Sequence, residues 1–167
     1  MDTSLALSLN HLAAHMTGIL PLFSDWMVYI VFAFSAAWVV GHHLGRPKLI
    51  AIDFVYTLAA PVGLAVIISE VLSKIVDRSR PFVASKEITL FPSHHTTVMI
   101  AIAIALWFRN HNFGNLLLVL SILSGLARIG AGIHYPTDIL AGVLIGWLTA
   151  WGIHRLTKEQ RLRALRA

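Results

Sequence analysis

The chain has 167 residues, of which 57% are hydrophobic and only 13% carry a formal charge. A mean hydropathy of +0.74 excludes a soluble domain of ordinary composition and indicates a protein that lies in lipid. Cysteine is absent, which excludes disulfide bonds, a thiolate nucleophile and cysteine metal ligands. The net charge of +5 is compatible with three kinds of partner, namely nucleic acid, anionic lipid and phosphate-bearing substrates.

Five apolar segments are long enough, or nearly so, to cross a bilayer as α-helices, which takes about 20 residues. They cover residues 26–41, 49–72, 96–108, 116–127 and 139–153. The third and fourth segments are short, so we expect both to extend into flanking polar residues. Residues 4–23 favour an amphipathic interfacial helix over a sixth span. The sequence therefore predicts an all-α integral membrane bundle of five transmembrane helices, or six if the N-terminal segment also crosses.

The same pattern divides the chain into three parts, an amphipathic segment (1–24), a membrane domain (25–154) and a basic tail (155–167). No Lys or Arg precedes the first apolar residues, so we expect no cleaved signal peptide. The tail lacks aromatic residues between its basic ones, so nucleic-acid binding is not expected. A basic tail after an apolar segment suits the cytoplasmic headgroups. Five of the thirteen basic residues lie in it: Arg155, Lys158, Arg161, Arg163 and Arg166.

With the tail in the cytoplasm, five spans assign a side to each loop. Arg46, Lys48 and Arg109 then face the cytoplasm, in agreement with the preference of basic residues for that side. The loops around residues 73–95 and 128–136 face the opposite side, and they contain the unusual polar residues of the sequence.

The first polar cluster contains Lys74, Arg78 and Arg80 and ends at Pro81. Guanidinium groups bind phosphate oxygens in a bidentate manner, so the cluster is a candidate anion site. The alternative is that these are ordinary membrane-flanking basic residues that contact lipid headgroups, and for this cluster alone that interpretation is favoured.

The second cluster, Ser93, His94 and His95, lies at the start of the third predicted span. The unpaired amides of a first helical turn can hold an anion, and a histidine can donate a proton near neutral pH. The alternative is an N-cap serine followed by two interfacial histidines.

The third cluster contains Arg128, His134 and Asp138. His134 and Asp138 are four residues apart, so both lie on one side of a helix that begins near Tyr135. The carboxylate can then accept from one imidazole nitrogen and leave the other nitrogen available for attack. A lone His-x-x-x-Asp pattern is usually structural, but two further polar clusters on the same side favour a catalytic role.

Together these motifs resemble those of the type 2 phosphatidic acid phosphatase superfamily, which are Lys-x6-Arg-Pro, Pro-Ser-Gly-His and Ser-Arg-x5-His-x3-Asp. The resemblance covers about residues 25–154 in motif order and spacing. Within that superfamily, the small size and the Pro-Ser-x-His-Thr-Thr run are most similar to the bacterial undecaprenyl-diphosphatases.

The resemblance implies that His134 is a nucleophile that becomes a phosphohistidine, that Asp138 stabilises its imidazole, and that His95 protonates the leaving group. It also implies a set of residues that bind the substrate phosphate: Lys74, Arg80, Ser93, His94 and Arg128.

The chain departs from the family pattern at three positions. The lysine of the first motif would fall at Ser73, one residue before Lys74, so Lys74 reaches the phosphate from a shifted position or Arg78 replaces it. His94 stands where glycine is usual, and Ala127 replaces the serine before Arg128.

No metal or other cofactor is required by this scheme. The nine histidines raise a metal alternative, but His11 and His15 have helical i,i+4 spacing without a third ligand at a useful distance. The expected partners are membrane lipids and a lipid phosphate or diphosphate substrate, with the conversion of undecaprenyl diphosphate to undecaprenyl phosphate as the first candidate reaction. Phosphatidylglycerophosphate and phosphatidic acid are alternative substrates, and a non-catalytic lipid-binding protein is an alternative class. The expected location is the bacterial inner membrane, with the site facing the periplasm or exterior.

Overall fold

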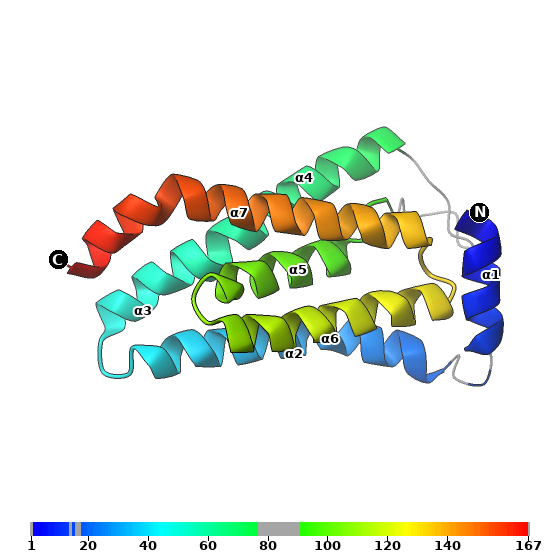
Figure 1. Ribbon diagram of the computed structural model, residues 1–167, viewed down its shortest axis with the longest axis horizontal. Helices are drawn as coiled ribbons and strands as arrows, with labels where there is room; N and C mark the ends of the chain where they lie inside the picture. The colour runs from blue at the N-terminus through cyan, green and yellow to red at the C-terminus, as the bar shows by residue number, and fades with distance from the viewer. Residues whose placement is uncertain (1, 14, 16–17, 77–90, 167) are drawn as a thin grey trace.

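The computed structural model describes residues 2–13, 15, 18–76 and 91–166 of the chain, and the secondary structure of these residues is entirely helical (Figure 1). Four segments are long and apolar enough to cross a membrane, and α5 is a shorter apolar helix. The prediction of an all-α membrane bundle is therefore confirmed. The helices are α1 (Asp2–Leu12), α2 (Ile19–His42), α3 (Pro47–Phe54), α4 (Ala60–Val76), α5 (His94–Trp107), α6 (His111–Gly130) and α7 (Pro136–Arg166).

Helix α5 forms the centre of the bundle, and every one of its residues is buried or half-buried. It packs against α2, α4, α6 and α7. Its 14 residues would be short for a lone transmembrane helix, but the neighbouring helices enclose it on several sides and cover its apolar surface. Glycines of α7 allow a close approach to α5, because a Cβ on Gly146 would meet the carbonyl oxygen of Thr97 at 2.5 Å.

The outer helices carry large apolar side chains that are exposed. Among them are Val119 and Ile122 of α6 and Leu140 and Leu144 of α7, each more than half exposed. A soluble protein rarely exposes so much contiguous apolar surface. Lipid contact explains it, and the chain is a multi-pass membrane protein.

The connections between helices alternate between the two ends of the bundle. The α2–α3 turn, the α5–α6 turn and the C-terminus lie at one end, and α1, the start of α2 and the α6–α7 loop lie at the other (Figure 1). Arg46, Lys48 and Arg109 therefore share an end with the basic tail, as the sequence predicts.

The helix bounds differ from the predicted segments near both ends of the chain. The first span begins at Ile19 rather than near residue 26, so residues 19–23 belong to α2 and the single helix expected over 4–23 is divided. Helix α7 continues through the predicted basic tail to Arg166 without a break. Its Lys, Arg and Glu residues favour helix, and the apolar span before them supplies the nucleus.

Helix α1 lies across the ends of α6 and α7 (Figure 1). Asn10 donates to the carbonyl oxygen of Gly130 at 2.8 Å, and the Thr137 hydroxyl donates to Asp2 at 2.6 Å. Ala6 is fully buried against the apolar cluster that contains Ile129. These contacts fix α1 beside the α6–α7 loop.

A π-helix, η2 (Val55–Ala59), joins α3 to α4 within a continuous helical segment of 30 residues. Pro61 follows it and has no N–H to donate to the carbonyl of Thr57, four residues earlier. A local widening of the helix is one way in which a chain accommodates such a proline.

A buried ion-pair network stabilises the end of the bundle that contains the C-terminus. The Asp53 carboxylate is fully buried and accepts two hydrogen bonds from the Arg109 guanidinium, one of them at 2.6 Å. Nε2 of His43 lies 3.1 Å from the same carboxylate, and the Thr57 hydroxyl donates to it at 3.3 Å. The network joins α2, α3, η2 and the α5–α6 turn.

We expect Asp53→Ala to destabilise the protein by about 3–5 kcal/mol, because it leaves the Arg109 guanidinium buried without a counterion. The measurement is the thermal unfolding midpoint in detergent. As a control, Asp53→Leu combined with Arg109→Met removes both charges and should recover most of the loss. An unchanged midpoint in Asp53→Ala would contradict a stabilising role for the network.

Candidate functional site

The start of α7 brings His134 and Asp138 together. Nδ1 of His134 lies 3.6 Å from Oδ2 of Asp138, and both side chains are almost completely buried. The same carboxylate oxygen accepts from the backbone N–H of Tyr135 at 2.8 Å, which is how an acidic residue in the first turn caps a helix. Gly132, with φ of 70°, allows the tight turn that directs the chain from α6 into this pair. One ring nitrogen of the His134 imidazole therefore faces the Asp138 carboxylate.

The start of α5 is joined to the start of α7 through the backbone. The N–H of Ser93 donates to the carbonyl oxygen of Asp138 at 3.1 Å. Ser93 is fully buried at the N-cap position of α5, and its hydroxyl accepts from Thr96 at 3.1 Å. A Cβ on Gly142 would meet the Ser93 carbonyl oxygen at 3.0 Å, so this glycine allows the close contact. The second and third sequence motifs thus form one structural unit.

The end of α6 contributes Arg128, whose side chain is 8% exposed. Its Nη1 donates to Oδ1 of Asp25, on α2, at 2.7 Å. The same carboxylate oxygen lies 4.0 Å from Nε2 of His95. The structure therefore brings together four of the predicted site residues at one end of the bundle: His95, Arg128, His134 and Asp138.

The remaining predicted phosphate-binding residues have different surroundings. Nδ1 of His94 lies 3.9 Å from the Glu70 carboxylate of α4. Lys74 is exposed, whereas Ser73, the position that corresponds to the family lysine, is buried. Lys74 therefore extends from a different face of α4 than the family residue would. Arg78, Arg80 and Pro81 lie outside the described residues.

Sequence reasoning missed Asp25. It is the one acidic residue between Asp2 and Asp53, and it lies in the first apolar helix. An ionisable residue within a membrane helix is a candidate functional residue in its own right, and this signal could have identified it. Its partner could not be identified from the sequence, because 103 residues separate Asp25 from Arg128.

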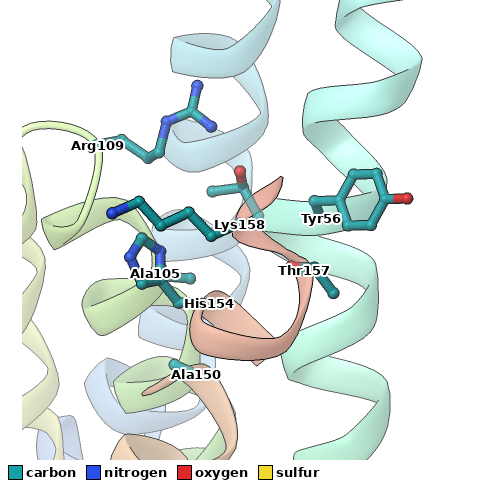
Figure 2. A pocket seen from close by; sticks show the side chains of 8 residues that line it. Tyr56, Ala105, Arg109, Ala150, His154, Thr157 and Lys158 are labelled. Carbon is teal, nitrogen blue, oxygen red and sulfur yellow. The ribbon is translucent and has the colours of Figure 1, made fainter. Parts of the chain in front are cut away.

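A separate pocket lies at the opposite end of the bundle (Figure 2). It contains several cationic side chains, but Arg109 is paired with Asp53 and the His154 ring stacks on Phe108 at 4.0 Å between centroids. Among the residues that the structure describes, no carboxylate lines this pocket, so it presents no imidazole–carboxylate pair there. Its lining residues are Tyr56, Thr57, Ala105, Arg109, Ala150, His154, Thr157 and Lys158.

Two solved structures have a similar fold. One is LpxE of Aquifex aeolicus, with a TM-score of 0.62 and 21% identity over 92% of this chain and 94% of that one. The other is the PAP2-type phosphatidylglycerolphosphate phosphatase of Bacillus subtilis, with a TM-score of 0.66 and 18% identity over 95% of this chain and 85% of that one. At such low sequence identities, the similarity to these two structures shows a shared fold and nothing more.

Curated relatives have higher sequence identity. Undecaprenyl-diphosphatase BcrC of Bacillus subtilis (strain 168) is 34% identical over 119 residues, which are 66% of this chain and 58% of the relative. Putative undecaprenyl-diphosphatase YbjG of Escherichia coli (strain K12) is 30% identical over 106 residues, 58% of this chain and 53% of the relative. The chain thus spans little more than half the length of these two proteins. Residues 52–162, well over half of the chain, match the model of the PAP2 superfamily, and the chain therefore belongs to that superfamily.

Proposed function

We propose that this protein is a membrane phosphatase that hydrolyses a lipid-linked diphosphate, with undecaprenyl diphosphate converted to undecaprenyl phosphate as the preferred reaction. The observation that carries the proposal is the meeting of the His134–Asp138 pair with Arg128 and His95 at one end of an apolar helical bundle. The names of the two curated relatives favour the diphosphate over other lipid phosphates.

In the proposed first step, Nε2 of His134 attacks phosphorus. A P–N bond forms while the P–O bond to the leaving group breaks, and His95 transfers its proton to the departing oxygen. Asp138, beside Nδ1, stabilises the positive charge that develops on the imidazole. Water then attacks the phosphohistidine, the P–N bond breaks, and inorganic phosphate leaves.

The phosphoryl oxygens need cationic and hydrogen-bonding partners, because negative charge accumulates on them during transfer. Arg128 is buried at the site and suits this role. Ser93 contributes the N-terminus of α5, whose amides and helix dipole favour an anion. The scheme also assigns Lys74, Arg80 and His94 to phosphate binding.

An apolar groove at the same end of the bundle as the site suits a lipid substrate. It has a volume of about 410 Å³ and lies between α1, α2 and α6. Ala127, which precedes Arg128 in the sequence, lines it together with Leu20 and Leu126. This groove offers an isoprenoid or acyl chain an apolar surface at the end of the bundle that contains Arg128.

We expect the purified protein in detergent to release phosphate from undecaprenyl diphosphate faster than from phosphatidylglycerophosphate, phosphatidic acid or lipid A phosphates. Activity should persist in EDTA, and vanadate should inhibit it, because vanadate mimics pentacoordinate phosphorus. Phosphate release from all four substrates is the measurement. A faster rate on another lipid would reassign the substrate, and loss of activity in EDTA that Mg²⁺ restores would contradict the metal-independent scheme. No release from any lipid phosphate would favour a non-catalytic lipid-binding protein.

We also propose that the site faces the exterior of the bacterial inner membrane and that the C-terminus is cytoplasmic. The shared end of Arg46, Lys48, Arg109 and the tail supports this orientation. Single cysteines at Arg163 and Lys86 should react with a membrane-impermeant thiol reagent from opposite sides, and the absence of native cysteine makes the labelling specific. Reaction of both from one side would exclude this topology.

A further inference from the structure

The carboxylate of Asp25 lies between the side chains of Arg128 and His95. Its Oδ1 accepts a hydrogen bond from Nη1 of Arg128 at 2.7 Å and lies 4.0 Å from Nε2 of His95. Asp25 belongs to α2, outside the three sequence motifs and outside residues 52–162 that match the superfamily. One oxygen from an otherwise apolar helix thus contacts the guanidinium that the proposed function assigns to the substrate phosphate.

Two residues of α2 contact the Arg128 guanidinium. Besides Asp25, its Nη1 lies 3.4 Å from the hydroxyl of Ser24, and Ser124 donates to the Ser24 carbonyl oxygen at 3.4 Å. An arginine side chain has several rotatable bonds, and fixing it in one rotamer costs conformational entropy. A buried guanidinium also requires a counterion. A carboxylate on a packed helix meets both needs before the substrate arrives.

Two interpretations of this contact make opposite predictions. In the first, Asp25 holds Arg128 throughout the reaction while the phosphate binds elsewhere on the guanidinium. In the second, the carboxylate occupies the position of a phosphoryl oxygen and competes with the substrate. A guanidinium has five N–H donors in a planar fork, so one carboxylate and one phosphate can bind it together. The Asp25 side chain is 54% exposed whereas that of Arg128 is 8% exposed. This difference suits the first interpretation, in which Asp25 contacts the buried guanidinium from the edge of the site.

We propose that Asp25 is a positioning residue for phosphoryl transfer, which holds the Arg128 guanidinium in the orientation that binds the phosphoryl oxygens. The proposal rests on the proposed function in that Arg128 is taken as a phosphate-binding residue. Asp25 itself contacts no reacting atom in this scheme.

The first test compares full-length wild type with Asp25→Asn and Asp25→Glu in detergent. The dissociation constant of orthovanadate, measured as its shift of the thermal unfolding midpoint, should increase about 10–100-fold in Asp25→Asn, the range expected for losing a charge-assisted hydrogen bond. The value of kcat/KM should fall by a similar factor on an activated aryl phosphate and on the lipid diphosphate. Asp25→Glu should retain most of the affinity, because it keeps the carboxylate.

A double-mutant cycle tests whether Asp25 acts through Arg128. In an Arg128→Lys background, Asp25→Asn should weaken vanadate binding by less than threefold further, because the guanidinium that it orients is already gone. Glu159→Gln is the matched control. It removes a carboxylate that faces Arg163 on the exposed tail, and it should leave vanadate binding and turnover unchanged.

Three outcomes would overturn the proposal. Vanadate that binds Asp25→Asn more tightly than wild type would identify Asp25 as a competitor for the phosphate position, and unchanged binding would deny it any part in the site. Losses that add in the double variant would show that Asp25 acts independently of Arg128. If wild type bound vanadate but hydrolysed no lipid phosphate, the proposed function would fall, while the vanadate affinities would still decide the role of Asp25.

Discussion

Replacement of His134 by alanine is expected to abolish turnover and covalent phosphate labelling together. The proposed P–N bond forms on this imidazole, so without it the phosphoryl group has no acceptor. The His134 side chain is almost completely buried beside Asp138. A water molecule that filled its space in His134→Ala would not be held in line with the phosphorus atom, as the ring nitrogen is. We expect a loss of at least about 10⁴-fold in kcat, as for other residues that act as part of a nucleophilic unit. The measurements are steady-state phosphate release and acid-labile labelling with radioactive phosphate.

Two further variants make this prediction specific. Asp138→Asn should weaken both turnover and labelling, because the amide no longer stabilises the charged imidazole. His111→Ala removes a histidine at the opposite end of the bundle, and it should leave both readouts near wild type. Substantial activity in His134→Ala would exclude a phosphohistidine at this position.

Replacement of His95 by alanine is expected to give a loss that depends on the leaving group. A general acid contributes about 10²–10⁴-fold when the departing oxygen needs a proton. Lipid alkoxides depend most on this proton, an activated aryl phosphate needs almost none, and a diphosphate that leaves as a phosphate is intermediate. The ratio of kcat in wild type and His95→Ala should therefore fall along the series from phosphatidic acid through undecaprenyl diphosphate to the aryl phosphate.

The neighbouring histidine is the main alternative donor. His94 lies 3.9 Å from Glu70, and its side chain is 40% exposed. His94→Ala should have a smaller effect than His95→Ala on a poor leaving group, and the double variant should resemble His95→Ala alone. If His95→Ala lowered kcat equally for good and poor leaving groups, His95 would not be the general acid. A double variant much worse than either single one would mean that His94 can replace it.

The local parts of the site could be predicted because they depend on neighbours in sequence. His134 and Asp138 lie close together because they are four residues apart at the start of a helix, and the carboxylate caps that helix. Ser93 is the N-cap of α5 for the same local reason. The length of each apolar segment predicted the spans, since the thickness of a bilayer fixes how many helical residues can cross it.

Other features depend on contacts between distant segments, and the sequence alone could not predict them. The burial of Ser73 rather than Lys74 follows from how α4 rotates against its neighbours, a rotation that motif spacing does not specify. Helix α5 became the centre of the bundle because four other helices pack around it, although its own sequence resembles a short span.

The sequence by itself determined the membrane class, the spans and the three motifs of the site, because apolar length and helical periodicity are local properties. Only the tertiary structure decided that Asp25 would pair with Arg128 and that Asp53 would pair with Arg109, at separations of 103 and 56 residues. Ion pairs within a bundle form where packed helices bring opposite charges to the same depth. That depth is set by the packing of the small and apolar side chains between them, and no spacing along the chain encodes it.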